Sequence, residues 1–240
     1  CRFITHRLCT TLAWCVAVLC MGTASAAATS SPAIALHYGA KPPVAELQAF
    51  DWVVLEPSHT PDPTTLPQRH TQWFAYVSVG ELDAQRDYAA ALPAAWLRGH
   101  NPAWASRPID HTAPGWSEFF AEQIIGPLWQ KGWRGFFLDT LDAHHLFART
   151  PQELQAQEDA LVTAIDALHA RFPGIRLIAN RGFEILPRLK GRVQAVVAES
   201  LFRGWDAATQ SYVQVSTSYH DWLLAQLRRD AGVATDLEVL

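Results

Sequence analysis

The sequence is poor in cysteine and in charged residues. Its four cysteines (Cys1, Cys9, Cys15 and Cys20) all lie within the first 20 of 240 positions. The rest of the chain can therefore form neither a disulfide nor a cysteine-ligated metal site. Charged residues make up 18% of the chain and hydrophobic residues 49%, a balance that excludes an intrinsically disordered protein. The formal net charge of −4 argues against a nucleic-acid-binding surface.

Several motifs are also missing. The chain has no G-x-G-x-x-G or Walker-type loop, so nothing in it predicts nucleotide binding. It has no G-x-S-x-G elbow, which argues against a serine hydrolase. Asp142, His144 and His145 stand close together, but no H-x-x-x-H or H-E-x-x-H spacing accompanies them. We therefore expect no metal ion and no other cofactor, and we keep a metal-dependent hydrolase as a third alternative.

The first 26 residues have the pattern of a secretory signal peptide. Arg2 and Arg7 precede an apolar run from Leu12 to Met21, and an A-x-A site follows at Ala24-Ser25-Ala26. The run is shorter than the roughly 20 apolar residues that span a bilayer. A first core helix is the alternative. We expect a signal peptide at 1–26, a flexible leader at 27–33, and a periplasmic or secreted protein that has no membrane attachment after signal removal.

From residue 34 onwards, short apolar runs alternate with helical patterns. Uniformly apolar strands are typical of a parallel sheet that is buried on both faces. The predicted strands are Ile34–Tyr38, Trp52–Leu55, Trp73–Val79, Pro108–Asp110, Gly135–Leu138, Ile175–Ala179, Ala195–Ala198 and Leu237–Leu240. Eight strands in this length predict an α/β fold, a (β/α)8 TIM barrel over 34–240, apparently truncated after the eighth strand. A doubly wound open sheet is the alternative.

Three helices are predicted between these strands. Ser117–Gln130 places its apolar residues on one side. The segment Thr150–Glu153 has the pattern of a capping box with proline at the first helical position, and we expect Gly174 to end the helix that follows. A third helix is expected to open at Ser218 and to end near Gly232.

Polar residues stand where the predicted strands end. In a (β/α)8 barrel the catalytic groups project from the C-terminal ends of the strands. Those ends carry Tyr38, Glu56, Glu81, Asp110, Asp139, Asn180 and Glu199. Desolvating an ionised carboxylate at an apolar rim costs several kcal/mol unless the group is paired. The proximity of several carboxylates raises the pKa of some of them. A raised pKa is what a general acid needs at neutral pH.

Asp139 and Glu199 stand out because each follows an apolar strand, two strands apart in the predicted barrel. Glycoside hydrolysis uses such a pair, one acid to protonate the leaving oxygen and one carboxylate to attack or to activate water. The alternative is that each acid caps a helix or pairs with Arg181 or Arg203. Trp205, just beyond Glu199, is the best candidate for stacking on a sugar.

Five motifs together resemble a known family. They are Tyr38-Gly39 with Pro42-Pro43, Tyr76–Glu81, Gly135–Asp142, Asn180–Glu184 and Ala198–Phe202. In this order they are similar to the endo-α-1,4-galactosaminidase-like glycoside hydrolases of families 114 and 166. The resemblance spans nearly the whole chain after the signal peptide. It implies a (β/α)8 barrel that cleaves α-1,4-linked, partially deacetylated N-acetylgalactosamine polysaccharide, the Pel-type exopolysaccharide of biofilms.

The resemblance also implies roles for particular residues. Asp139 and Glu199 would be the catalytic pair, with Glu199 as the acid/base and Asp139 as the nucleophile. The residues that we expect to bind substrate are Tyr38, Glu56, Glu81, Asp110, Asp142, Asn180, Arg181 and Trp205. The expected partners are a galactosamine-rich polysaccharide and the exopolysaccharide export machinery. The alternative from another class is a non-catalytic barrel that binds the polysaccharide during export.

Overall fold

The computed structural model describes residues 32–240 except positions 61, 69, 207, 234–237 and 240. The predicted signal peptide and most of the predicted leader therefore lie outside the described residues. All elements below belong to the compact unit that contains residues 32–240.

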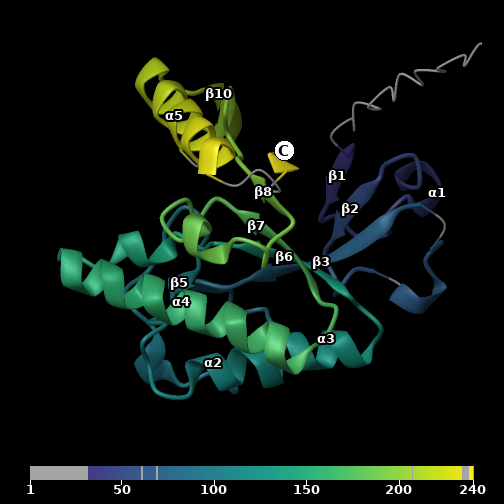
Figure 1. The fold of residues 1–240 in the computed structure, drawn as a ribbon, viewed down its shortest axis with the longest axis horizontal. Helices are drawn as coiled ribbons and strands as arrows, with labels where there is room; N and C mark the ends of the chain where they lie inside the picture. The colour runs from purple at the N-terminus through teal and green to yellow at the C-terminus, as the bar shows by residue number, and fades with distance from the viewer. Residues whose placement is uncertain (1–31, 61, 69, 207, 234–237, 240) are drawn as a thin grey trace, which may run out of the picture. The chain divides into compact units, whose positions relative to one another are not determined.

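The centre of the fold is a parallel, curled sheet that forms part of a barrel (Figure 1). Its seven strands are β1 (Ile34–His37), β2 (Trp52–Leu55), β3 (Gln72–Ser78), β6 (Gly135–Asp139), β7 (Arg176–Asn180), β8 (Ala195–Val197) and β11 (Glu238–Val239). They lie side by side in the order in which they occur along the chain, and every pair is parallel. The (β/α) barrel-type fold is thus confirmed. A doubly wound sheet would reverse its strand order at a switch point, and this one does not.

The three predicted helices are confirmed. The helices are α1 (Val44–Leu47), α2 (Trp116–Phe119), the π-helical turn η3 (Phe120–Ile125), α3 (Gly126–Gln130), α4 (Pro151–Arg171) and α5 (Thr217–Val233). The first predicted helix is formed by α2, η3 and α3 in succession, and the short helix α1 was not predicted. The 3₁₀ turns are η1 (Pro63–Thr65), η2 (Ala94–Trp96), η4 (Ala143–Leu146) and η5 (Leu186–Leu189). The capping box at the start of α4 is confirmed, with Thr150 and Glu153 bonding each other's backbone amides. Helix α5 starts one residue early, because Ser216 and not Ser218 accepts the bond from the Tyr219 amide.

Two features differ from the predicted strands. The segment 108–110 is not a barrel strand, since β5 (Arg107–Pro108) pairs antiparallel with β4 (Glu81–Leu82) in a separate two-stranded sheet. Pro108 has no amide hydrogen to donate, which suits such a short edge pairing. A second antiparallel hairpin, β9 (Arg203–Asp206) and β10 (Ser211–Gln214), was not predicted because its strands are largely exposed and carry no buried apolar alternation.

The two faces of the barrel sheet bury different clusters. The outer face carries residues such as Val53, Ala75 and Phe136, which join the large core shared with the helices. Helix α4 packs on the α2–α3 segment on that side (Figure 1). The inner face carries a smaller cluster, namely Trp52, Val54, Phe74, Phe137, Ile178, Ala195 and Val197. Successive residues of a strand point to opposite faces, so every second residue belongs to this inner set.

Candidate active site

The inner alternation continues past the apolar cluster into polar residues. Two positions beyond an inner apolar residue, a side chain points to the same face again. Val54 is followed in this way by Glu56, Phe74 by Tyr76, Phe137 by Asp139, Ile178 by Asn180 and Val197 by Glu199. The parallel strands therefore end in a ring of polar groups on top of a hydrophobic floor. This is the C-terminal end of the strands, where barrel enzymes carry their chemistry.

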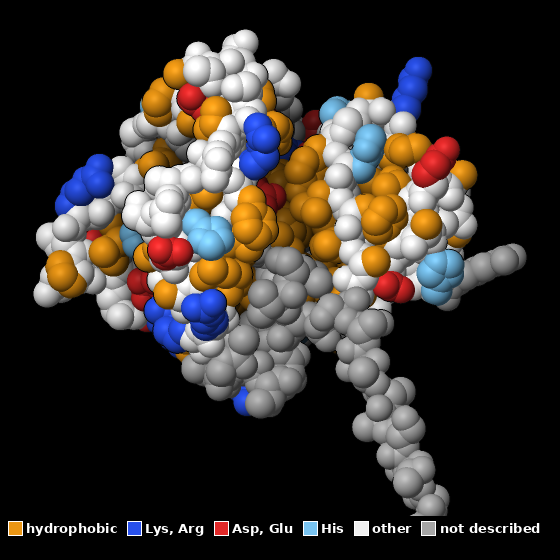
Figure 2. Space-filling view, turned by 90° about the horizontal axis from the view of Figure 1, so that it is seen from above, with side chains coloured by type: hydrophobic (Ala, Val, Ile, Leu, Met, Phe, Trp, Pro, Cys, Tyr) orange, Lys and Arg blue, Asp and Glu red, His pale blue; other side chains and the backbone are white. Residues whose placement is uncertain are grey.

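These polar groups line one large cleft of about 1570 Å³. Figure 2 shows a face that is hollowed, with hydrophobic side chains along the hollow and acidic side chains within it. Of the predicted site residues, the cleft brings together Tyr38, Glu56, Glu81, Asp139, Asp142, Asn180, Arg181, Glu199 and Trp205. The cleft exceeds the roughly 300–1,000 Å³ of ordinary small-molecule pockets, so it has room for a larger ligand.

Asp139 is held at the end of β6 by three donors. The Tyr76 hydroxyl donates to Oδ2 at 2.6 Å, the Asn180 amide donates to Oδ1 at 2.7 Å, and the Thr140 backbone N–H donates to Oδ1 at 2.8 Å. An ionised carboxylate has only acceptor sites, so it can take all three of these hydrogen bonds without a competing donor of its own. These donors therefore fix the orientation of the Asp139 carboxylate and stabilise its charge.

Glu199 is in a different environment in the same cleft. Desolvation by the surrounding protein raises the pKa of Glu199, and the nearby charge of Asp139 raises it further. A hydrogen bond from Asn180 and the charge of Arg181 act in the opposite direction without cancelling the shift. Asn180, which bonds Asp139, thus also stabilises the charged form of Glu199. The two carboxyl groups are close enough for the charge of one to shift the pKa of the other.

The backbone turns sharply after each of these strand ends. Thr140, Arg181 and Ser200 follow Asp139, Asn180 and Glu199 directly, and they have φ angles of +61°, +58° and +65°. Residues other than glycine in this left-handed region cost about 1–3 kcal/mol each, and such strain gathers at functional sites. Around Thr140 the conformation is supported by bonds from its Oγ1 to the Asp139 carbonyl and from the Gly80 amide to Oγ1.

Tyr76 is a site residue that sequence reasoning missed. Its hydroxyl bonds Asp139, and its ring stacks on Phe137 and meets the Tyr38 ring edge-on at 4.9 Å. Burial and the neighbouring carboxylates raise the pKa of both tyrosines, so both keep their protons, and Tyr76 donates its own to Asp139. The signal was available, because Tyr76 lies two positions after the inward-facing Phe74 in a buried strand.

The other acids of the cleft have partners of their own. Glu56 forms an ion pair with Arg86 at 2.9 Å and accepts two bonds from Ser58. Asp142 forms an ion pair with Arg181 at 3.3 Å. These two acids therefore position arginines along the cleft. Sequence reasoning missed Arg86, which lies in an irregular segment with no pattern that marks it.

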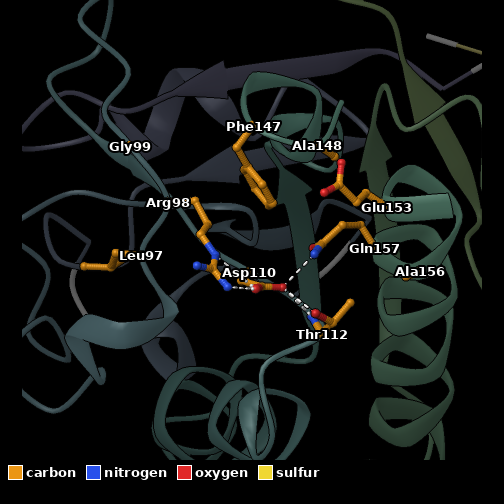
Figure 3. A pocket seen from close by; sticks show the side chains of 10 residues that line it. All are labelled: Leu97, Arg98, Gly99, Asp110, Thr112, Phe147, Ala148, Glu153, Ala156 and Gln157. Carbon is orange, nitrogen blue, oxygen red and sulfur yellow. Dashed lines mark hydrogen bonds and ion pairs between the residues drawn. The ribbon is translucent and has the colours of Figure 1, made fainter. Parts of the chain in front are cut away.

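Asp110 is not in the cleft, contrary to its prediction as a substrate-binding residue. It lies in a separate hollow of about 620 Å³ (Figure 3), where five bonds reach its carboxylate from Arg98, Thr112 and Gln157. These partners lower the pKa of Asp110 to about 2 against the effect of its burial. The predicted position of Asp110 at the end of a barrel strand was wrong, because β5 pairs with β4 outside the barrel sheet.

Aromatic side chains line the part of the cleft next to Glu199. Trp205 and Tyr212 lie on the β9–β10 hairpin with ring centroids 5.3 Å apart, and both are exposed. Tyr219 and Trp222 of α5 also line the cleft and lie under the Arg181 guanidinium. Three of these rings, those of Trp205, Tyr212 and Trp222, are exposed and are available to contact a ligand. Of these four rings, only Trp205 was predicted as a residue that contacts the substrate.

Two kinds of feature, a metal-ligand cluster and a membrane-spanning helix, are absent from the part of the chain that the structure describes. No three His, Asp or Glu side chains there are grouped to hold a metal ion. Within the same residues, none of the helices combines the length and hydropathy of a bilayer-spanning segment.

Comparison with known proteins agrees with this geometry. The family model of glycoside hydrolase family GH114 matches residues 21–221. The structure of the glycoside hydrolase domain of PelA from Pseudomonas aeruginosa is 36% identical, with a TM-score of 0.77 over 87% of this chain and 82% of that one. A variant of that domain with one glutamate replaced by alanine matches with a TM-score of 0.75 at the same identity and coverage.

A more distant match concerns the fold alone. Ega3 from Aspergillus fumigatus, solved in complex with galactosamine, is 16% identical with a TM-score of 0.55 over 70% of this chain and 68% of that one. No curated protein matches the sequence. The family model and the similarity to the PelA domain, taken with the acid-lined cleft at the strand ends, show that this chain belongs to glycoside hydrolase family GH114.

Proposed function

We propose that the protein is an endo-acting hydrolase of α-1,4-linked, partially deacetylated N-acetylgalactosamine polysaccharide, of the Pel type. The observation that carries this proposal is the pair Asp139 and Glu199, which line one cleft, close enough for the charge of Asp139 to raise the pKa of Glu199, but which have different environments. Membership of GH114 supports the hydrolase activity. The resemblance of the strand-end motifs to galactosaminidases supports the choice of polymer.

The two environments suit the two roles of a retaining mechanism. Glu199, whose pKa is raised, gives its proton to the glycosidic oxygen as the C–O bond breaks. Asp139, held as a carboxylate by Tyr76, Asn180 and the Thr140 amide, attacks the anomeric carbon to form a glycosyl ester. Glu199, now ionised, then takes a proton from water, whose oxygen displaces Asp139 and restores both groups.

The charge of the cleft supports a cationic substrate. Seven acidic and three arginine side chains line it, namely Glu56, Glu81, Asp83, Asp139, Asp142, Glu184 and Glu199 against Arg86, Arg181 and Arg203. A cleft lined by one sign of charge attracts ligands of the other sign. Free galactosamine units carry an ammonium group and N-acetylated units are neutral. We therefore propose that the deacetylated units of the polymer are bound preferentially.

The proposed place of action follows from the predicted signal peptide at 1–26. It would export the enzyme to the periplasm or beyond, where an exopolysaccharide passes. The export machinery for that polymer is the proposed protein partner. The protein acts there without a membrane attachment in this proposal.

The experiment is a panel of galactosamine polymers with different degrees of acetylation, incubated with the purified protein. Release of reducing ends, with oligosaccharides of several lengths as early products, is the expected result for an endo-acting enzyme. Proton NMR of the first product should show retention of the anomeric configuration. Binding of the polymers without any release of reducing ends would overturn the proposal and support the non-catalytic binding barrel. Inverted products would overturn the role given to Asp139.

A further inference from the structure

A hairpin-like arm formed by residues 97–109 carries an exposed tryptophan to the cleft. The two sides of the arm pair at Leu97 with Ile109 and at Asn101 with Ser106. The Asn101 amide donates to the Ser106 carbonyl at 2.8 Å, which leaves residues 102–105 as the tip. Trp104 in this tip is 65% exposed and lines the same cleft as Asp139 and Glu199.

The base of the arm is fixed by Asp110. Figure 3 shows the Asp110 carboxylate between Arg98 on one side and Thr112 and Gln157 on the other. Arg98 of the arm donates to Oδ2 from both Nε and Nη2, and Gln157 of helix α4 donates to Oδ1 at 2.6 Å. The acid therefore connects the arm to the longest helix of the barrel, and its hydrogen-bonding capacity is used in doing so.

The tip of the arm is fixed by Glu81. This buried acid accepts bonds from the Asn101 side chain at 3.1 Å to each oxygen and from the Ser106 hydroxyl. Asn101 and Ser106 are the two ends of the tip, so one carboxylate holds both. A buried charge is costly to keep without a cationic partner. Glu81 is ringed instead by neutral donors, which fits a role in holding the loop in place.

Asp110 and Glu81 therefore hold a segment whose largest apolar side chain, Trp104, contributes little to the stability of the fold. The Trp104 ring lies mostly in solvent, and an exposed indole contributes little to the core. In strand order the arm comes from the β3 side of the cleft, and the Trp205 hairpin comes from the β8 side. Strand β6, which carries Asp139, lies between them. A long polymer that crosses the acids therefore has an exposed ring available on each side.

We propose that the arm 97–109 is a substrate-binding arm, in which Trp104 stacks on a sugar ring of the polysaccharide away from the bond that is cut. Glu81 and Asp110 are positioning residues that hold the arm and do not themselves contact the sugar. The inference rests on the proposed function for its polymeric substrate. It reassigns two acids that the sequence placed at barrel strand ends.

The test compares a long and a short substrate in Trp104→Ala. On the galactosamine polymer we expect kcat/KM to fall about tenfold, the equivalent of about 1.4 kcal/mol, mainly through KM. On the shortest oligosaccharide that the wild type cleaves, kcat/KM should not change. Trp104→Phe should keep most of the polymer activity because it keeps a ring. Phe202→Ala, at a similarly exposed ring outside the cleft lining, is the matched control and should behave as the wild type.

Two results would overturn the proposed substrate-binding role of the arm. One is unchanged polymer activity in Trp104→Ala, and the other is an equal loss on both substrates. Affinity for the polymer is measured in parallel on the Glu199→Ala background, so that the arm is tested without turnover. A wild-type protein that releases no reducing ends contradicts the proposed function alone. Equal affinities with and without Trp104 contradict the arm.

A second set of variants tests the role of Glu81. Glu81→Gln turns an amide donor toward the donors of Asn101 and Ser106, and it should lower polymer activity to the extent seen in Trp104→Ala. The loss in the double variant should not exceed either single loss, because both changes remove the same platform. Adding Asn101→Asp to Glu81→Gln restores a donor–acceptor pair and should recover activity. Additive losses, or no recovery, would overturn the positioning role of Glu81.

Discussion

Asp139 and Glu199 differ in what surrounds them more than in what they are. Three donors meet the Asp139 carboxylate within 2.8 Å, whereas desolvation and the charge of its neighbour dominate at Glu199. These different surroundings are what the proposed division of roles between the two acids rests on. Asn180 bonds Asp139, and it also lowers the pKa of Glu199 in part, so it is linked to both acids.

Tyr76→Phe tests the donor set of Asp139. The change removes one hydroxyl and leaves the ring that stacks on Phe137. A hydrogen bond to a charged group contributes about 1.5–3 kcal/mol, so we expect kcat/KM to fall about ten- to a hundredfold. Steady-state kinetics on the polymer measure this, with thermal unfolding to check the fold. An unchanged kcat/KM would show that Asp139 does not depend on this donor.

Glu199→Gln tests the raised pKa through stability. Because the folded state binds the Glu199 proton more tightly than the unfolded state, the free energy of unfolding falls as pH rises from about 4.5 through the raised pKa. Glutamine has no such charge, so the variant should be more stable than the wild type at pH 7. The gain should disappear below pH 4, where both states of the wild type are protonated. Denaturant unfolding at both pH values measures it, and equal stabilities at pH 7 would contradict the raised pKa.

At the scale of secondary-structure elements, the site depends on how strands end. Asp139 and Asn180 end their strands and Glu199 lies two residues beyond β8, and each is followed by a residue in the left-handed conformation. Gly80 allows the loop after β3 to pack against the first of these turns. A Cβ at Gly80 would collide with the Thr140 carbonyl oxygen and would lie 2.8 Å from the Ala143 Cβ. The loop after β3 therefore lies directly against the turn after β6.

Gly80→Ala should destabilise the protein for this reason. Overpacking against fixed backbone costs about 1–3 kcal/mol, and the turn that presents Asp139 must shift to relieve it. We expect a lower midpoint of thermal unfolding and a lower kcat. Gly204→Ala is the matched control for stability, because its new Cβ would meet only ordinary contacts from 3.5 Å. Equal destabilisation of the two variants would mean that the contact with Thr140 is not special.

Strand periodicity explains which elements could be predicted from the sequence. Apolar runs in the sequence identified the seven strands of the described barrel sheet, and the capping box located α4 to within a residue. The run at 108–110 was misassigned because an apolar dipeptide in an arm has the same composition as a short strand. The β9–β10 hairpin escaped because its pairing leaves both strands exposed, so no burial pattern marks it. Bonds such as Asn101 to Glu81 join distant segments and have no local signature.

At the scale of the whole molecule, the parallel arrangement of the strands brings residues from separate strand ends together in one cleft. Asp139 and Glu199 are 60 positions apart in the sequence, and the order β6, β7, β8 brings them to one rim with Asn180 between. The same arrangement gathers more acids than arginines in the cleft. Electrostatic attraction of this kind acts over about 8–10 Å and weakens as salt is added.

The affinity for the polymer should therefore depend on salt and on acetylation together. For a largely deacetylated galactosamine polymer, we expect the Kd measured on Glu199→Ala to rise with ionic strength, because salt screens the acids from the ammonium groups. For a fully acetylated polymer, the same titration should be nearly flat. Similar salt slopes for both polymers would contradict the role of cleft charge in substrate choice.

The most direct measurement of the central claim is reducing-end release from purified galactosamine polymer by three proteins, namely the wild type, Asp139→Asn and Glu199→Gln. Both substitutions keep the shape of the side chain, and circular dichroism confirms that the variants are folded. The account predicts rapid release by the wild type and a loss of at least about a thousandfold in each variant, since removing one member of a catalytic set costs most of its effect. Turnover near the wild-type level in either folded variant would contradict it.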